Sequence, residues 1–255
     1  MPGNPNPIGL LPIILLCLWW TPFVVAHGGC DDPPARRVNW QGCDKQNADL
    51  READLREAVL GRSDLSGANL SQAQLSRADL GQAILRETDF AGARLTDGRL
   101  VGAKAEKARF TATAMAGARL ERATLTEASF ERADLSGAEL YQADLSGAVL
   151  TNADLTRARL VQADLTDANL EKANLREAVL SRTILEGARL QNANLLGAKL
   201  DNSNLLGADL SNADLSKADL HGARIDNADF TGAKLDSAIW VDRRRCRPGS
   251  VGECQ

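Results

Sequence analysis

Four cysteines flank the long central part of the chain, and their chemistry is the easiest to anticipate. Cys30 and Cys43 precede that part, Cys246 and Cys254 follow it, and a fifth, Cys17, lies in an apolar stretch near the N-terminus. An even number of cysteines outside such a stretch is typical of disulfides in an exported chain. The short separations at each end favour two local pairs, Cys30–Cys43 and Cys246–Cys254.

Two other uses of these cysteines remain open. Four thiolates can bind zinc, although no CxxC pair supports a zinc site here. The run from His27 to Cys30 resembles a lipoprotein signal, with His27 where Leu is usual, and lipidation of Cys30 would leave Cys43 without a partner. We expect disulfides and no metal.

The sequence contains few residues that suit acid–base catalysis. The histidines are His27 and His221, the one tyrosine is Tyr141, and no Ser/His/Asp arrangement can be built from them. The chain has no glycine-rich phosphate loop, HExxH motif or EF-hand pattern. The many Asp residues recur at one position of a repeat, which indicates a structural use. We therefore expect neither an enzyme nor a cofactor.

The first 26 residues differ from the rest of the chain. Residues 8–26 are uncharged and mostly apolar, and Val24 and Ala26 suit a cleavage site before His27. The run is just long enough to span a bilayer, so an uncleaved anchor is the alternative. We expect a signal peptide at 1–26 and an exported, periplasmic or extracellular protein. It would not bind membranes after cleavage unless Cys30 is lipidated.

Between the cysteine pairs the sequence repeats every five residues. From Leu50 to Leu235 each fifth residue is large and apolar, usually Leu, and only Ala105 departs from this; two residues before each stands a small residue, usually Ala. Leucines five apart would wind around a helix, which turns by about 100° per residue, and would alternate between the faces of a strand. A chain that turns a corner once per pentapeptide points them all inward.

The second position after the central residue has the composition of a corner. Gly or Asn stands there in many repeats, for example Gly67, Gly147 and Asn212. Both residue types tolerate a positive φ. The sequence therefore predicts an all-β solenoid rather than a set of globular domains.

The repeat resembles the pentapeptide-repeat family, whose consensus is A(D/N)LXX. The match is direct at 48–50 and 143–145, both Ala-Asp-Leu, and at 168–170, Ala-Asn-Leu. The resemblance implies a right-handed quadrilateral β-helix with four pentapeptides per coil. Over residues 48–238 this amounts to about 9.5 coils and a length of roughly 46 Å.

Aromatic residues support four pentapeptides per coil. The four Phe of the repeats are separated by multiples of one coil and so fall on one wall: Phe90, Phe110, Phe130 and Phe230. Trp40 and Trp240 share another wall and are expected to cover the ends of the core, since a solenoid needs capped ends.

We expect four segments along the chain. They are a signal peptide (1–26), an N-terminal Cys/Trp cap (27–47), the β-helix (48–238) and a C-terminal Trp/Cys cap (239–255).

Charged side chains sort unevenly onto the four walls. The chain has a net charge of −4; residues 241–255 carry +2 and residues 1–47 carry none, so the repeat region carries −6. The wall around central residues 65, 85, 105 and so on is the most acidic, and the wall around 60, 80, 100 and so on is net basic. This polarity marks a candidate interaction surface, formed by Asp64, Glu127, Asp144, Asp164, Asp167, Arg99, Arg119, Arg122 and Arg159.

These observations predict a non-enzymatic, exported rod or scaffold that binds an unidentified protein partner, as a monomer or an end-to-end dimer. The alternative is a DNA-mimic modulator of DNA gyrase or topoisomerase, because some members of the family imitate duplex DNA. Duplex DNA carries about one charge per 1.7 Å, or roughly 27 over such a rod. The repeat region carries far less, and an acidic chain is not expected to bind nucleic acid directly.

Overall fold

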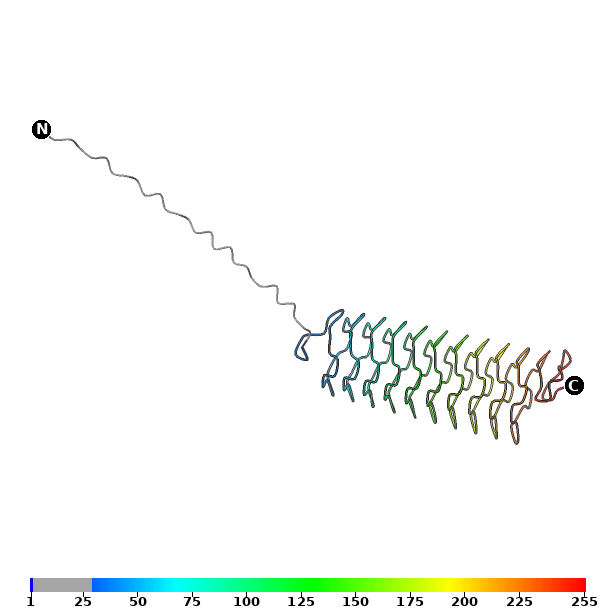
Figure 1. Cartoon of the computed structure of the whole chain (residues 1–255). Coiled ribbons are helices and arrows are strands. Elements are labelled where there is room, and N and C mark those ends of the chain that lie inside the picture. Colours follow the sequence, from blue (N-terminus) through cyan, green and yellow to red (C-terminus); the bar gives the residue numbers. More distant parts are fainter. Residues whose placement is uncertain (2–28) are drawn as a thin grey trace.

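The protein is a rod of stacked coils, seen in a computed structural model that describes Met1 and residues 29–255 (Figure 1). The coils follow one another in sequence order, so the N-terminal cap and the C-terminal tail lie at opposite ends of the rod. Residues 2–28 lie outside the described residues; they comprise the expected signal peptide apart from Met1, with Cys17, and also His27. Within the described part, no helix has the length and apolar character needed to cross a bilayer.

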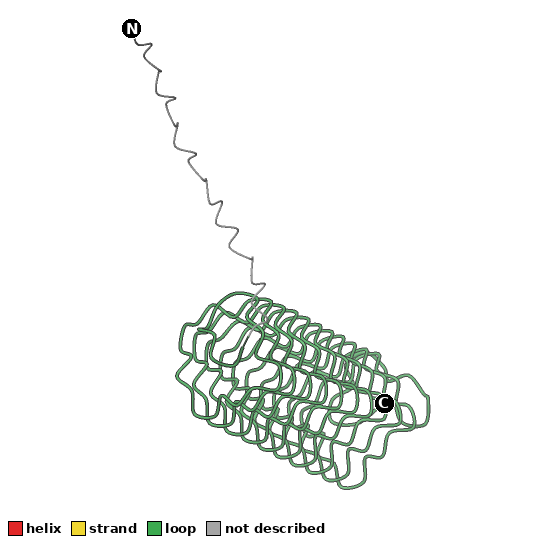
Figure 2. Cartoon of the chain, turned by 60° about the vertical axis from the view of Figure 1, so that its left-hand side comes forward, coloured by secondary structure: helices red, strands yellow, loops and turns green. Residues whose placement is uncertain are grey.

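Parallel β-bridges between residues one coil apart hold the rod together. The series runs without interruption from Asn39↔Val59 to Asp219↔Ile239. Figure 2 shows the coils as flat-sided hoops, and residues 29–255 form neither a helix nor a strand longer than one bridge. The fold is the expected right-handed quadrilateral β-helix. Its ladder begins at Asn39 rather than Ala48, so part of the expected N-terminal cap belongs to the first coil.

Backbone hydrogen bonds account for the five-residue period. In the repeat centred on Leu80, the central N–H and the second and fourth N–H after it donate to carbonyls of neighbouring coils at 2.7–2.9 Å. The third donates back to the Leu80 carbonyl at 3.0 Å and closes a turn. The remaining N–H, that of Gly81, donates to the Asp79 carboxylate at 2.8 Å. Asp or Asn before the central residue thus supplies the one acceptor that the backbone lacks.

Inward side chains form a dry, layered core. Every central residue from Leu55 to Leu220 is fully buried. Phe90, Phe110 and Phe130 stack face to face, with ring centroids 4.9 and 4.8 Å apart, as their shared wall predicted. Where Thr113 replaces the usual Ala, its hydroxyl donates to the Phe90 carbonyl at 2.7 Å, so the buried oxygen is not left without a partner.

Positive φ is a property of every corner, not only of those with Gly or Asn. From Asn47 to Ser237, each second residue after a central residue has a φ in the left-handed region, and charged residues such as Arg122 (57°) and Lys172 (58°) adopt it as well. This backbone conformation costs an ordinary residue about 1–2 kcal/mol, so the ladder must impose it.

The N-terminal end is closed by an aromatic ring, a cation and a disulfide. Trp40 is buried, its indole N–H donates to the Asp32 carbonyl at 3.1 Å, and the Lys45 ammonium lies 4.2 Å from its ring centroid. Lys45 occupies a central position of the repeat, where the sequence otherwise places Leu. Cys30 and Cys43 are joined by a disulfide beside this ring.

An arginine cluster ties the N-terminal segment to the next two coils. The Glu57 carboxylate accepts hydrogen bonds from Arg36 at 2.5 Å, from Arg37 at 2.8 Å and from Arg77 at 3.0 Å. Hydrogen bonds from Arg36 and then Arg37 hold the pKa of Glu57 down at about 2. The carboxylate therefore stays charged, and the cluster intact, at any pH near neutrality.

The C-terminal tail folds back across the last coil. It forms two antiparallel bridges, Ile239↔Arg245 and Lys234↔Val251, and a disulfide joins Cys246 to Cys254. The Trp240 ring packs edge-on against Phe230, with centroids 5.3 Å apart. The tail thus provides hydrogen-bond partners for some of the backbone groups that the last coil would otherwise leave open.

The corner conformation can be tested with a pair of opposite substitutions. Gly137→Ala is expected to lower the free energy of unfolding by about 1 kcal/mol, because φ is +64° and a Cβ there would meet no atom within 4 Å, so only backbone strain is added. The reverse change at an equivalent corner, Ala112→Gly (φ 53°), is expected to leave stability unchanged or to raise it. Urea unfolding measures both; a neutral Gly137→Ala would contradict the account.

Candidate interaction surface

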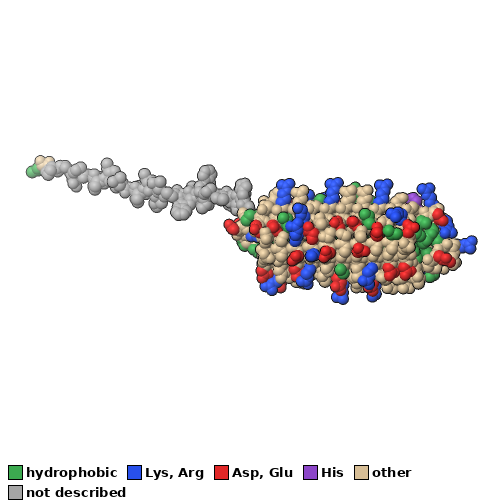
Figure 3. All heavy atoms as spheres, turned by 90° about the horizontal axis from the view of Figure 1, so that it is seen from below, with side chains coloured by type: hydrophobic (Ala, Val, Ile, Leu, Met, Phe, Trp, Pro, Cys, Tyr) green, Lys and Arg blue, Asp and Glu red, His purple; other side chains and the backbone are tan. Residues whose placement is uncertain are grey.

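Outward residues form vertical rows, because each position recurs one coil later on the same wall. We call the outward residues around central residues 60, 80, 100 and so on to 220 the basic wall. Those around 65, 85, 105 and so on to 225 are the acidic wall. On the face drawn in Figure 3, basic and acidic side chains both occur along the length of the rod.

The structure does not bring the predicted acidic residues into one patch. Asp144 and Asp164 are bridged neighbours, but Asp64 lies four coils from Asp144 along the same row, with Ile84 and Lys104 among the intervening residues. Asp144 accepts hydrogen bonds from the Ser146 N–H at 3.1 Å and hydroxyl at 2.7 Å, and Asp164 does the same for Thr166. These carboxylates therefore act as hydrogen-bond acceptors that stabilise the turns following them.

Two more of the predicted acidic residues sit at corners of that wall. Glu127 lies 3.7 Å from the Lys107 ammonium, one coil away, and both side chains are largely exposed. Asp167 lies directly over Gly187 of the next coil, where a Cβ would come within 2.4 Å of its carboxylate.

The predicted basic residues lie on one wall and are paired with acceptors of that wall. Arg99 contacts Asp79 at 2.7 Å, and Arg119 contacts Glu121 at 3.0 Å. The other two follow the same rule: Arg159 pairs with Glu139 at 3.1 Å, and Arg122 donates to Gln142 at 3.2 Å. Local pairing reduces the polarity that the charge count indicated.

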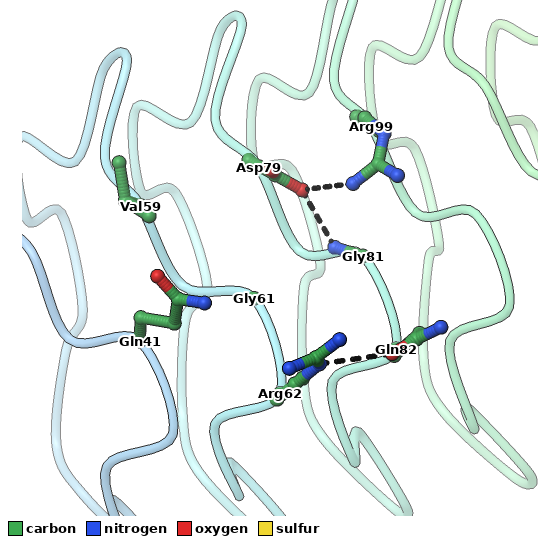
Figure 4. Close-up of a pocket in the computed structure, with 8 residues that line it drawn as sticks. All are labelled: Gln41, Val59, Gly61, Arg62, Asp79, Gly81, Gln82 and Arg99. Atoms are coloured by element: carbon green, nitrogen blue, oxygen red, sulfur yellow. Dashed lines mark hydrogen bonds and ion pairs between the residues drawn. The ribbon is translucent and has the colours of Figure 1, made fainter.

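One hollow interrupts the basic wall, in the coils nearest the N-terminus (Figure 4). It measures about 180 Å³, and Gly61 and Gly81 of successive coils form its floor. The Arg99 guanidinium reaches across this floor, where a Cβ on Gly81 would come within 2.2 Å of its Nη1. Arg62 borders the opposite side and donates to Gln82 at 3.0 Å.

The chemistry of the hollow suits a small anionic group. Two guanidinium groups and the amides of Gln41 and Gln82 line it, and Asp79 is the one carboxylate among the lining residues. Guanidinium forks match carboxylate or phosphate oxygens. Glycines in the floor allow a ligand to approach the backbone closely. Among the described residues, no group of three or more His, Cys, Asp or Glu is arranged to hold a metal ion.

Sequence reasoning selected Arg99 but not the hollow beside it. The missed signal is simple: between Leu50 and Leu235, Gly follows the central residue directly at positions 61 and 81 alone, and these are one coil apart. Every other repeat in this range carries a side chain there, which fills the wall. The signal is therefore the absence of a side chain at two positions that are neighbours in the rod, not the presence of a motif.

A family model described as pentapeptide repeats matches the chain in eight copies that together run from residue 36 to residue 239. The chain belongs to the pentapeptide-repeat family. No curated protein matches it.

One of the solved structures that match aligns with most of the rod. It is HetL, a pentapeptide repeat protein involved in heterocyst differentiation regulation from the cyanobacterium Nostoc, with 35% identity over 82% of this chain and 92% of that chain, and a TM-score of 0.56.

Two further solved structures match with lower TM-scores. A pentapeptide repeat protein from the cyanobacterium Cyanothece has 39% identity over 40% of this chain and 63% of that chain, with a TM-score of 0.24. QnrB1, a plasmid-mediated fluoroquinolone resistance protein, has 18% identity over 78% of this chain and 91% of that chain, also with a TM-score of 0.24.

The structural use of the acidic wall leads to a direct prediction. Asp144→Ala is expected to lower the free energy of unfolding by about 1 kcal/mol, because the Ser146 N–H loses its acceptor. Asp144→Asn is the matched control: it removes the charge but keeps the oxygen, as Asn169 does for Glu171 at 3.0 Å, and should stay within about 0.5 kcal/mol of the parent. Equal losses in urea unfolding would show that the charge, not the bond, matters.

Proposed function

We propose that this pentapeptide-repeat protein is an exported, non-enzymatic rod that binds a protein partner through its basic wall. The hollow between Arg62 and Arg99 takes a carboxylate of the partner. The observation that carries the proposal is this hollow, which offers two guanidinium groups over a glycine floor. An anion seated there would share Arg99 with Asp79 and gain charge-assisted hydrogen bonds.

The character of the outward groups supports a binding role over an enzymatic one. Most of the side chains described on the acidic and basic walls cap turns, form ion pairs or donate to glutamine side chains, which restricts their positions. A rigid ladder also presents those positions with little conformational freedom to lose on binding.

Export is supported by the two disulfides and by the composition of the first 26 residues. Disulfides persist in oxidising compartments and are rare in the cytosol. Both pairs close short segments at the ends of the rod, Cys30–Cys43 and Cys246–Cys254, where the repeat itself supplies fewer contacts.

Mimicry of duplex DNA is less well supported. A phosphate row is continuously negative, whereas the main row of the acidic wall has Ile84, Lys104 and Thr124 between Asp64 and Asp144. The basic wall likewise alternates Arg119, Glu139 and Arg159.

A binding experiment with matched variants tests the proposal. The immobilised protein is exposed to the extracytoplasmic fraction of its host, and bound proteins are identified. Arg62→Glu/Arg99→Glu is expected to reduce capture of the specific partner about tenfold or more, because two favourable contacts become repulsive. Arg132→Glu/Arg157→Glu, at corners of the other two walls, is the control and should capture it normally.

Two outcomes would contradict the proposal. If both variants capture the partner equally, the hollow is not the contact. If the native chain is found only in the cytosol, with its cysteines reduced on non-reducing gels, export is wrong.

A further inference from the structure

The C-terminal end of the rod is covered on only two of its four walls. The antiparallel bridges of the tail lie at Lys234 and Ile239. The preceding two walls, residues 223–232, complete the same edge without such cover. Within the described residues, the amides of Ile225 and Phe230 find no acceptor, and the carbonyls of Ala223 and Ala228 find no donor. In every earlier coil the equivalent groups bond to the next coil.

The charged side chains of this open edge lack ion-pair partners, although the Asp229 carboxylate accepts a hydrogen bond from the Thr231 N–H at 2.8 Å. Arg224 and Asp229 occupy the two bridge positions, are exposed, and take part in no ion pair within residues 29–255. Ile225 and Ala228 are partly exposed, although their equivalents in the interior are fully buried. Figure 3 shows hydrophobic side chains gathered near this end of the rod. An unpaired edge of this kind is a template for pairing with another chain.

We propose that this edge pairs with the same edge of a second copy of the chain about a two-fold axis. Arg224 then stands opposite Asp229 of the second copy. The Ile225 N–H donates to the Ala228 carbonyl of the second copy, and the Phe230 N–H donates to its Ala223 carbonyl. Symmetry repeats each contact, so the open amides of Ile225 and Phe230 and the open carbonyls of Ala223 and Ala228 all find partners. The corner amides of Asn227 and Gly232, which also lack an acceptor in the described residues, stay outside this pairing.

The bond pattern is one that this end of the rod already uses. Around the bridge between Ile239 and Arg245, the Trp240 N–H donates to the Arg244 carbonyl at 2.8 Å and the Cys246 N–H donates to the Ala238 carbonyl at 2.9 Å. A bridge between Arg224 and Asp229 of the second copy has the same geometry. The edge therefore accepts antiparallel pairing without a change of its backbone.

Side-chain size and charge are complementary in this register. The large Ile225 lies across from the small Ala228 of the second copy, and Phe230 lies across from its Ala223. Two Arg–Asp pairs flank these contacts. A shift by one residue would place the side chains on the wrong faces, which makes the register specific.

The tail determines the shape of the pair. It adds a layer to the walls of Leu235 and Trp240 in each copy, so two rods in contact at the open walls meet at an angle rather than coaxially. The contact lies near the corner at 226–227. The basic wall stays accessible in both copies, so this pairing is independent of the proposed hollow.

Sedimentation across a range of protein concentrations tests the pairing. The chain of 27.3 kDa is expected to form a dimer that Arg224→Asp or Asp229→Arg weakens about tenfold or more, because each change sets like charges opposite each other twice. The double variant Arg224→Asp/Asp229→Arg restores the pairs and should recover the dimer, which separates the contact from any effect on folding. Lys217→Glu, exposed on a side wall, is the control.

Three results would overturn the proposal. The first is a monomer at all concentrations with the disulfides intact. The second is a dimer that both single variants form as well as the parent. The third is a double variant that forms no more dimer than the single variants do. Hydrogen exchange provides an independent readout, since dimer formation should slow exchange at the amides of Ile225 and Phe230.

Discussion

Backbone hydrogen bonding between coils is the constraint on which the rest of this structure depends. In each pentapeptide three amides must find carbonyls in a neighbouring coil, and they do so only when residues twenty apart are aligned. That alignment imposes a positive φ at each corner, even on residues such as Arg122. It also stacks like side chains, so Phe90 meets Phe110 inside and Arg99 stands beside Arg119 outside. The ends of the rod cannot satisfy the same requirement alone, which explains the bridged tail.

The fold was predictable because the same five-residue pattern recurs throughout the central part of the sequence. One inward Leu per pentapeptide excludes a helix and a straight strand, and the spacing of Phe90, Phe110 and Phe130 indicates four pentapeptides per coil. Positive φ at Lys172 was not predictable, since the ladder imposes it against the preference of the residue. Lys45 at a central position was missed for a different reason: it covers the indole of Trp40 instead of entering the core.

The candidate site was predictable only in part, because it depends on exceptions to the repeat. Charge counting found Arg99 and Asp144 but could not show that Arg99 contacts Asp79 or that Asp144 caps a turn. Both interactions reduce the charge that a partner would meet. The hollow arises from what Gly61 and Gly81 lack, and the open edge at 223–232 arises from how far the tail reaches. In a uniform rod, such departures are where recognition can be specific.

Residue-resolved hydrogen exchange of the native protein tests the central claim most directly. A five-residue pattern of protection is expected in the middle of the rod. The amide of Leu140, bound to the next coil, should exchange slowly, and that of Tyr141, which has no acceptor within residues 29–255, should exchange fast. The amide of Ser146, held by the Asp144 side chain, should lie between them. Equal protection at Leu140 and Tyr141, or protection without the five-residue period, would contradict the account.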